Sequence, residues 1–188
     1  MKTLIINGSP RKQGDTMTLI NEMTKYLEGE VKILHTYYDN INPCVDCRYC
    51  SSNSGCSIND GMQEIYEYLK VADNVILASP LYFSELTGEL LSFASRLQLF
   101  YASKYIRKDD KINMKKKKGV LIISAGGSTK DLEHPTKTAN IIFRSMNVDS
   151  IGNVYAENTD RTPAKEDLKA LSEVRELALK LNDLSKHQ

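Results

Sequence analysis

The chain has 188 residues, 41% of them apolar and 26% charged, which is an ordinary balance for a globular protein and enough for one domain, 1–188, with a substantial core. Lysine and arginine number 25 against 24 acidic residues, so the net charge of +1 gives no electrostatic reason to expect nucleic acid or a membrane surface as a partner. No apolar stretch approaches the roughly 20 residues of a membrane-spanning helix, and the first apolar run lacks the features of a signal peptide, so we expect a cytoplasmic protein.

Five short apolar runs predict the strands of a sheet. Continuous aliphatic runs of this length are typical of strands buried on both faces, as in a parallel sheet. The last of the five runs is weaker than the others. In chain order the predicted strands are 3–6, 31–37, 74–79, 119–124 and 151–155.

Segments with apolar residues at helical spacing follow the strands. Strands that alternate with helices predict a doubly wound α/β sheet. The last helix is expected to carry Pro163 in its first turn. We predict a surface loop or subunit contact over 101–113, and a solvated lysine turn over 115–118, with a phosphate or partner contact as the alternative. The predicted helices are 16–27, 61–71, 87–99, 136–146 and 163–184.

The loop after the first strand, 8–16, carries groups that suit an anion. It leads into the N-terminus of a helix, where unpaired N–H groups and the helix dipole favour negative charge. Ser9 and Thr16 supply hydroxyl groups, and Arg11 supplies a charged fork that matches a phosphate. The glycine spacing fits neither a dinucleotide fingerprint nor a Walker loop. A terminal monophosphate is the favoured ligand, and an ordinary turn capped by Thr16 is the alternative.

Two further loops follow the third and fourth strands. In 79–84, Leu81, Tyr82 and Phe83 are apolar where a chain usually turns polar. They could form the wall of a pocket for a flat heterocycle, or they could simply cap the core. The small residues of 124–128 would let the backbone approach a ligand closely. Because the carboxyl ends of parallel strands share one edge, we expect all three loops to converge there.

Four cysteines are clustered between the second strand and the second helix. Such clustering points to metal or redox chemistry rather than to structural disulfides. Closely spaced thiolates on one loop can hold a [4Fe–4S] cluster, and four thiolates also suit zinc. Free or redox-active thiols are the third possibility. The four residues are Cys44, Cys47, Cys50 and Cys56.

Taken together, these loops resemble the NADPH-dependent FMN reductases and their relatives with the flavodoxin fold. The matching residues stand at 8–16, 79–83 and 125–127, and the resemblance covers the chain from Met1 to about Val154. It implies a flavodoxin-like three-layer sandwich, in which a five-stranded parallel sheet of order 2-1-3-4-5 is flanked by helices.

The resemblance also implies FMN as the cofactor and assigns residues to it. The FMN phosphate would be held by Ser9, Arg11 and Thr16, with Asp15 beside them. The isoalloxazine ring would be lined on one side by Pro80, Leu81, Tyr82 and Phe83, and approached on its far side by Ala125, Gly126 and Gly127.

This chain departs from the family pattern in two places. Many relatives have asparagine where this chain has Asp15, and an acid near a dianionic phosphate is unfavourable unless it turns away. In the third helix, relatives often carry a lysine and an aspartate where this chain has Leu91 and Ser95, whereas Arg96 is retained.

The function implied is that of an NAD(P)H-dependent FMN oxidoreductase, in which the flavin carries the chemistry and no side chain is catalytic. The acceptor would be a small molecule, and the sequence selects neither the acceptor nor NADH over NADPH. Relatives suggest a homodimer that associates through the third helix. The cysteine spacing resembles that of iron–sulfur flavoproteins, so the alternative is an electron carrier that uses FMN and a [4Fe–4S] cluster and exchanges electrons with a ferredoxin.

Overall fold

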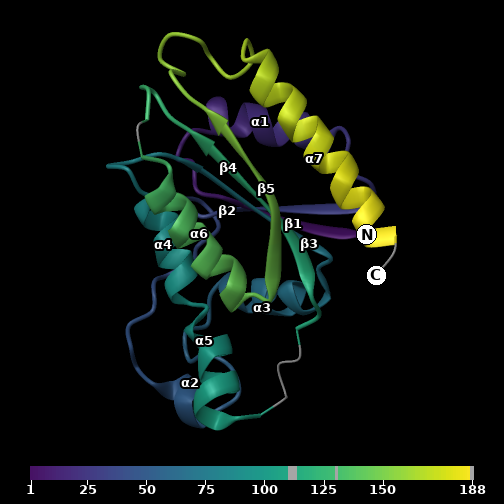
Figure 1. The fold of residues 1–188 in the computed structure, drawn as a ribbon. Coiled ribbons are helices and arrows are strands. Elements are labelled where there is room, and N and C mark those ends of the chain that lie inside the picture. The colour runs from purple at the N-terminus through teal and green to yellow at the C-terminus, as the bar shows by residue number, and fades with distance from the viewer. Residues whose placement is uncertain (110–113, 130, 187–188) are drawn as a thin grey trace.

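Five parallel strands form one sheet in the computed structural model, which describes residues 1–109, 114–129 and 131–186 (Figure 1). The strand order is β2-β1-β3-β4-β5, and every neighbouring pair runs parallel. This confirms the predicted fold class. The strands are β1 (Lys2–Asn7), β2 (Glu30–His35), β3 (Asn74–Pro80), β4 (Lys117–Ser124) and β5 (Val148–Ala156).

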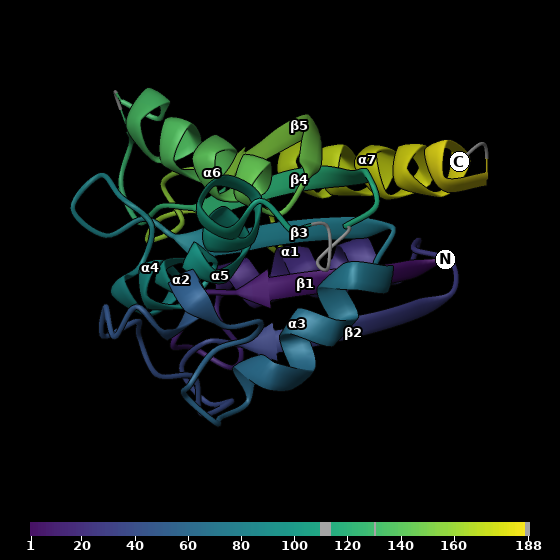
Figure 2. The same ribbon diagram turned by 90° about the horizontal axis from the view of Figure 1, so that it is seen from below.

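Helices cover both faces of the sheet, as the two views in Figures 1 and 2 show. On one face lie α1 (Asp15–Thr24) and α7 (Leu168–Lys186). The other face is covered by α3 (Met62–Val71), α4 (Gly88–Ser95) and α6 (Glu133–Ser145). The sheet is therefore the middle layer of three.

The two helical layers explain why the sequences of the strands are continuous apolar runs. Successive side chains of a strand point to opposite faces. In β1, Ile5 packs with α1 and α7, whereas Leu4 and Ile6 pack with α3 and α4. All three side chains are fully buried. Both faces of the sheet thus carry a hydrophobic core.

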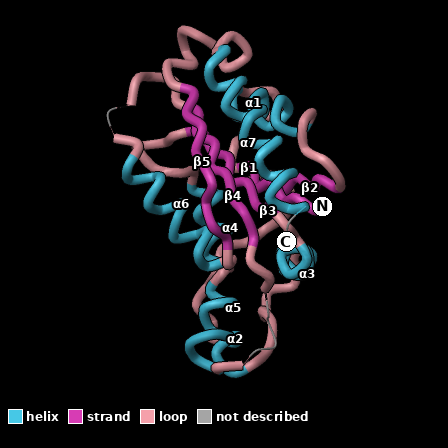
Figure 3. The backbone as a smooth tube through the Cα atoms, turned by 45° about the vertical axis from the view of Figure 1, so that its right-hand side comes forward, coloured by secondary structure: helices cyan, strands magenta, loops and turns pink. Residues whose placement is uncertain are grey.

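A small helical cluster projects beyond the α4 side of the sheet (Figure 3). It consists of α2 (Tyr49–Ser52), α5 (Gln98–Tyr101) and a π-helix, η1 (Ala102–Arg107). The prediction of a surface loop from 101 onward is therefore wrong as far as residue 107, because this stretch is helical and buries Ala102 and Ser103. The alternative, a subunit contact, stays a prediction. Residues 110–113 of that prediction lie outside the described residues.

The predicted lysine turn is wrong for Lys117 and Lys118, because both residues lie in β4. β4 begins at Lys117, two positions before the apolar run, and the Lys117 side chain is fully buried. The Lys117 ammonium donates hydrogen bonds to the carbonyls of Lys115 and Met146, at 2.9 and 3.1 Å. Lys115 and Lys116 are exposed, as expected.

The last helix begins at Leu168 rather than at Pro163, so Pro163 is not in its first turn. The preceding residues form turns instead, and the backbone N–H of Ala164 is bound by the Asp15 carboxylate at 2.8 Å. This contact ties the loop after β5 to the start of α1. Within the described residues, no helix is both long and apolar enough to cross a membrane.

Candidate functional site

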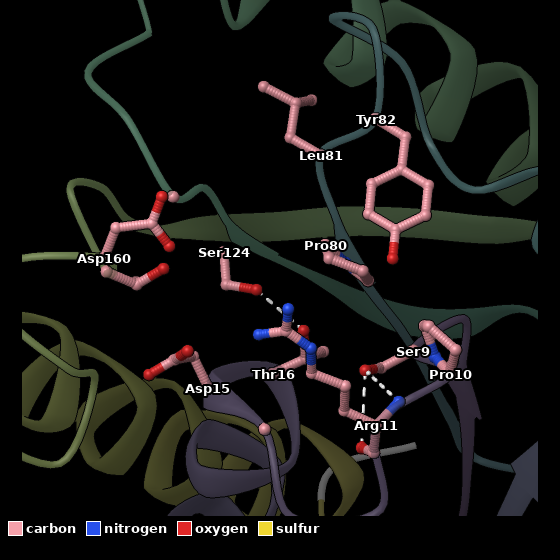
Figure 4. Close-up of a pocket in the computed structure, with 13 residues that line it drawn as sticks. Ser9, Pro10, Arg11, Asp15, Thr16, Pro80, Leu81, Tyr82, Ser124 and Asp160 are labelled. Atoms are coloured by element: carbon pink, nitrogen blue, oxygen red, sulfur yellow. Dashed lines mark hydrogen bonds between the residues drawn. The ribbon is translucent and has the colours of Figure 1, made fainter.

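A cavity of about 180 Å³ lies at the carboxyl ends of four strands (Figure 4). Loops that follow β1, β3, β4 and β5 contribute to its walls, so the convergence expected for three loops extends to a fourth. The lining residues are Ser9, Pro10, Arg11, Gly14, Asp15, Thr16, Pro80, Leu81, Tyr82, Ser124, Gly126, Thr159 and Asp160.

The loop after β1 is held in shape by its own hydrogen bonds. The Ser9 N–H donates to the side-chain oxygen of Asn7 at 2.9 Å. The Arg11 N–H donates to the Ser9 hydroxyl at 3.2 Å. The Ser9 and Asn7 side chains are both buried, whereas Arg11 is exposed and is drawn extended across the cavity in Figure 4.

The start of α1 provides N–H groups at the cavity. Gly14 is the N-cap and makes no side-chain cap, and the first helical bond runs from the Thr18 N–H to the Gly14 carbonyl at 2.9 Å. The earlier N–H groups of the helix have no intrahelical acceptor and suit an anion. The alternative reading of Thr16 as the N-cap is wrong, because this residue lies inside the helix and its hydroxyl pairs with that of Ser124 at 2.7 Å.

Asp15 lines the cavity, but its carboxylate is engaged elsewhere. One oxygen accepts the Ala164 N–H described above. The unfavourable approach of this acid to a phosphate is thereby reduced, because the side chain is held toward the loop after β5. Arg11 and the α1 N-terminus remain as the positive groups on this side of the cavity.

The loop after β3 divides into a part that lines the cavity and a part that leaves it. Pro80, Leu81 and Tyr82 are at the cavity wall. Phe83 is not: it sits with Ser84 at the tip of a two-residue turn, and its ring is fully exposed. Both tip residues have left-handed backbones, with φ of 51° and 60°. The predicted isoalloxazine wall therefore lacks Phe83 in this structure.

The loop after β4 reaches the cavity through Gly126. Ala125 is buried behind it and Gly127 is exposed, and neither lines the cavity. A Cβ at Gly126 would lie 2.6 Å from a carboxylate oxygen of Asp160, so any side chain there would force Asp160 to move. The close neighbour of Gly126 here is a protein group, Asp160, and the expected approach of this backbone to a ligand stays a prediction.

Sequence reasoning missed Thr159 and Asp160, and it placed Ser124 in the loop after the fourth strand without assigning a role to its side chain. The backbone N–H groups of Thr159 and Asp160 donate to the carbonyls of Ala125 and Gly126, at 2.9 and 3.1 Å, which docks the loop after β5 onto the loop after β4. A signal for them existed. The rule that places ligands at strand carboxyl ends applies to the fifth strand as well, and a polar turn follows it.

The four cysteines line a second pocket, together with Arg96 and Leu99. Cys47 is exposed and the other three are half-buried. Burial raises the pKa of Cys50, and a hydrogen bond with Ser57 lowers the pKa of Cys47.

The positions of the four cysteine thiols bear on whether they suit a single metal ion or an iron–sulfur cluster. In the described part of the chain, no three histidine, cysteine or acidic side chains meet as the ligands of one metal ion must. A [4Fe–4S] cluster is different, because each thiolate binds a separate iron and the four therefore surround a pocket. Four soft thiol donors around one pocket are compatible with such a cluster.

The cysteine loop is attached to neighbouring helices by side chains. The Cys44 N–H donates to the Ser95 hydroxyl at 2.9 Å. The Arg107 guanidinium donates to the Cys50 carbonyl. Ser95, one of the two departures from the family pattern, thus ties the end of α4 to this loop.

The chain matches known proteins in sequence. Residues 1–161 match the family model described as NADPH-dependent FMN reductase. An iron–sulfur flavoprotein of Methanosarcina thermophila is 30% identical over 191 residues, covering 98% of this chain and 95% of that protein. One of Methanocaldococcus jannaschii is 35% identical over 99 residues, or 51% of each protein. For three of the relatives, the match spans about half of the relative's length.

Solved structures share the fold. An NAD(P)H:quinone oxidoreductase from Methanothermobacter marburgensis superposes with a TM-score of 0.72 at 18% identity, covering 96% of each chain. An FMN-dependent NADH-azoreductase from Bacillus anthracis, in complex with FMN, gives 0.65 at 16% identity, covering 97% of this chain and all of that one. These likenesses establish the flavodoxin-like fold.

Proposed function

The chain belongs to the NADPH-dependent FMN reductase family, and from this premise we propose that it binds FMN and uses it to pass electrons from NAD(P)H to a small-molecule acceptor. The observation that carries the proposal is the meeting of four loops around one cavity at the carboxyl edge of the sheet. That edge is where open α/β sheets bind their ligands.

Each side of the cavity offers what one part of FMN requires. Ser9, Arg11 and the N-terminus of α1 would hold the phosphate through hydroxyl, guanidinium and backbone donors. Pro80 to Tyr82 would lie against the isoalloxazine ring, and Gly126 would pass close to it. When bound, FMN supplies the hydride chemistry, so the protein contributes binding and orientation.

A binding and activity assay tests this function. Purified protein is expected to be yellow, to release FMN on denaturation, and to oxidise NADH or NADPH in the presence of a quinone, free flavin, an aromatic compound or a ferric salt. The proposal would be contradicted if saturating FMN, mixed with apo protein, showed no quenching of its fluorescence and did not raise the melting temperature of the protein.

The cysteine pocket favours a second candidate function. Four thiols surround one pocket, and the relatives named above are iron–sulfur flavoproteins. The chain would then be an electron carrier in which Cys44, Cys47, Cys50 and Cys56 hold a [4Fe–4S] cluster and a ferredoxin is the partner. Anaerobic purification with iron and sulfide analysis separates the two. Stoichiometric cluster iron supports the carrier, and rapid NAD(P)H oxidation without it supports the reductase.

Two further parts of the proposal concern the oligomeric state and the cellular location of the protein. We propose a homodimer that associates around α4, and a cytoplasmic location. Tyr101, Tyr105 and Ile106, just beyond α4, expose large apolar side chains that suit such a contact. Sedimentation equilibrium is expected to give twice the chain mass of 21.2 kDa, and a monomer at micromolar concentration would contradict the dimer.

A further inference from the structure

Arg96, at the end of α4, is a buried arginine in the wall of the cysteine pocket. The residue as a whole is only 2% exposed. Both terminal nitrogens bind the Asp60 carboxylate, at 2.7 and 3.1 Å. They also donate to the carbonyls of Asn42 and Ile58, at 2.8 and 3.3 Å. The guanidinium is therefore fixed in orientation by partners on the cysteine loop itself.

One donor of this guanidinium is unused. The Nε–H of Arg96 has no partner, and it is one of two buried side-chain polar atoms without one in the described part of the chain. Native proteins pair nearly all such groups, so an unpaired buried donor marks a place where a ligand, an ion or a water molecule can accept a hydrogen bond. Four cysteines share the pocket that Arg96 lines, so a sulfur-containing group bound in this pocket is a candidate acceptor.

Cys56 lines the same pocket as the guanidinium and interacts with it electrostatically. Burial opposes the charge of Arg96, but the carboxylate of Asp60, the hydroxyl of Tyr66 and the thiol of Cys56 together raise its pKa. The Tyr66 hydroxyl also donates to the Arg96 carbonyl at 2.9 Å, which fixes the backbone at this point. Arg96 thus remains a cation beside the sulfur ligands.

A cluster bound by four thiolates carries net negative charge and gains one further negative charge when it accepts an electron. Hydrogen bonds and positive charge near the sulfurs stabilise the reduced form and raise the reduction potential. The Asp60 carboxylate is already neutralised by two charge-assisted hydrogen bonds. The unused N–H remains available to the cluster.

We propose that Arg96 is a buried cationic donor of the cysteine pocket, which presents its Nε–H to a [4Fe–4S] cluster held by Cys44, Cys47, Cys50 and Cys56. This inference deepens the second candidate function and rests on it. It makes Arg96 a residue that sets the potential of the cluster, in addition to anchoring the loop.

The test compares variants after anaerobic reconstitution with ferrous iron and sulfide. Asp60→Leu combined with Arg96→Met removes the guanidinium with its Nε–H and replaces the buried ion pair with apolar side chains, so that the net charge is unchanged and no lone carboxylate is left buried. Arg96→Lys keeps the charge but not the Nε–H. Arg144→Gln, on the exposed side of α6, is the control for loss of a distant positive charge.

The readouts are iron and sulfide per chain, the circular dichroism spectrum, and the midpoint potential from a dithionite titration followed by electron paramagnetic resonance. The double variant is expected to keep its spectrum and its cluster and to shift the reduction equilibrium at least tenfold toward the oxidised form, about 59 mV for one electron. Arg96→Lys is expected to shift it about threefold, or about 28 mV by the same conversion. Arg144→Gln is expected to leave it unchanged.

An unchanged midpoint in the folded double variant would overturn the proposal and leave Arg96 an anchor alone. If the double variant does not fold, an unchanged midpoint in Arg96→Lys overturns it. Wild-type protein that takes up zinc alone, or no metal, also overturns it. FMN content and NAD(P)H oxidation are measured on the same samples, so this last result is distinguishable from a failure of the FMN reductase function.

Discussion

At the scale of single residues, Arg11 is the exposed cation of the cavity. Arg11→Ala is expected to weaken FMN binding by about 1.5–3 kcal/mol, because a charge-assisted hydrogen bond to the phosphate is lost. That corresponds to roughly a tenfold to hundredfold rise in the dissociation constant. Fluorescence quenching of FMN measures it.

Lys12 provides a matched control for Arg11. Its ammonium lies over the Tyr38 ring, 4.8 Å from the ring centre, and it does not line the cavity. Lys12→Ala is therefore expected to change the FMN dissociation constant less than threefold. Equal losses in the two variants would mean that general positive charge, and not the Arg11 guanidinium, attracts the phosphate.

The buried Lys117 is expected to make the free energy of unfolding depend on pH. Burial, assisted by the nearby Lys115, lowers the pKa of Lys117 to about 8. The unfolded chain keeps this proton up to about pH 10.5, so between these values the native state binds fewer protons and the free energy of unfolding rises with pH. The expected rise is about 1–3 kcal/mol from pH 7 to pH 10.

Urea denaturation of wild type and Lys117→Met over this pH range isolates the effect. The substitution leaves two carbonyls without their donor, which changes the stability at every pH, but it removes the contribution of Lys117 to the slope. Parallel pH curves for the two proteins would show that Lys117 keeps an ordinary pKa.

The residues that line the cavity could be predicted from the sequence where they lie close together in the chain. Ser9, Arg11 and Thr16 stand within a few positions of a helix start, so their relation to the cavity follows from the loop alone. Asp160 could not be found that way, because its contact with Gly126 joins two loops that are far apart in the chain.

At the scale of elements, the turn at Phe83 and Ser84 is a source of strain. Tyr82 and Glu85 exchange both backbone hydrogen bonds, at 2.9 and 3.0 Å, while the two residues between them have positive φ. Asn-Gly is the preferred pair for such a turn. Phe83→Asn combined with Ser84→Gly is expected to raise the free energy of unfolding by about 1–2 kcal/mol.

For a chain of this size that gain corresponds to about 2–8 °C in melting temperature. Differential scanning calorimetry measures it. Phe83→Ala is the control, because it removes the exposed ring but keeps a side chain at positive φ, and it is expected to give no gain. A double variant no more stable than this control would mean that the turn is not strained.

The central parts of the strands follow from the sequence because burial on both faces leaves a clear apolar run. Element ends and short helices do not. The start of α7 depends on the Asp15–Ala164 contact, and α5 and η1 are too short for periodicity to define. Tertiary contacts decide such segments.

At the scale of the whole molecule, FMN would connect the four loops at one edge of the sheet. A ligand that binds only the folded state stabilises it by about 2.7 kcal/mol at a hundredfold excess over its dissociation constant. The expected rise in melting temperature is about 5–11 °C. Riboflavin, which lacks the phosphate, is expected to give a smaller rise at the same concentration, and an equal rise would contradict the assigned role of the loop after β1.

The architecture as a whole was predictable in two steps. Alternating strands and helices indicate a parallel sheet, but they leave its strand order open. The order 2-1-3-4-5 came from the resemblance of three loops to a known family, and the structure confirms it. The cysteine pocket was predictable as a cluster of thiols, whereas Arg96 and Asp60 beneath it were not, because their pairing joins α4 to a distant loop.

The cysteine loop has a further consequence, for protease digestion. Arg48 is exposed on this loop and has a left-handed backbone, and side chains of neighbouring helices hold the loop in place. Because Arg48 is exposed, we expect trypsin to cut after this residue while the sheet is still intact. Because the loop is bonded to neighbouring helices on both sides of the cut, the two pieces should stay associated. A bound cluster would join the sulfurs on either side of the cut site and delay this first cleavage.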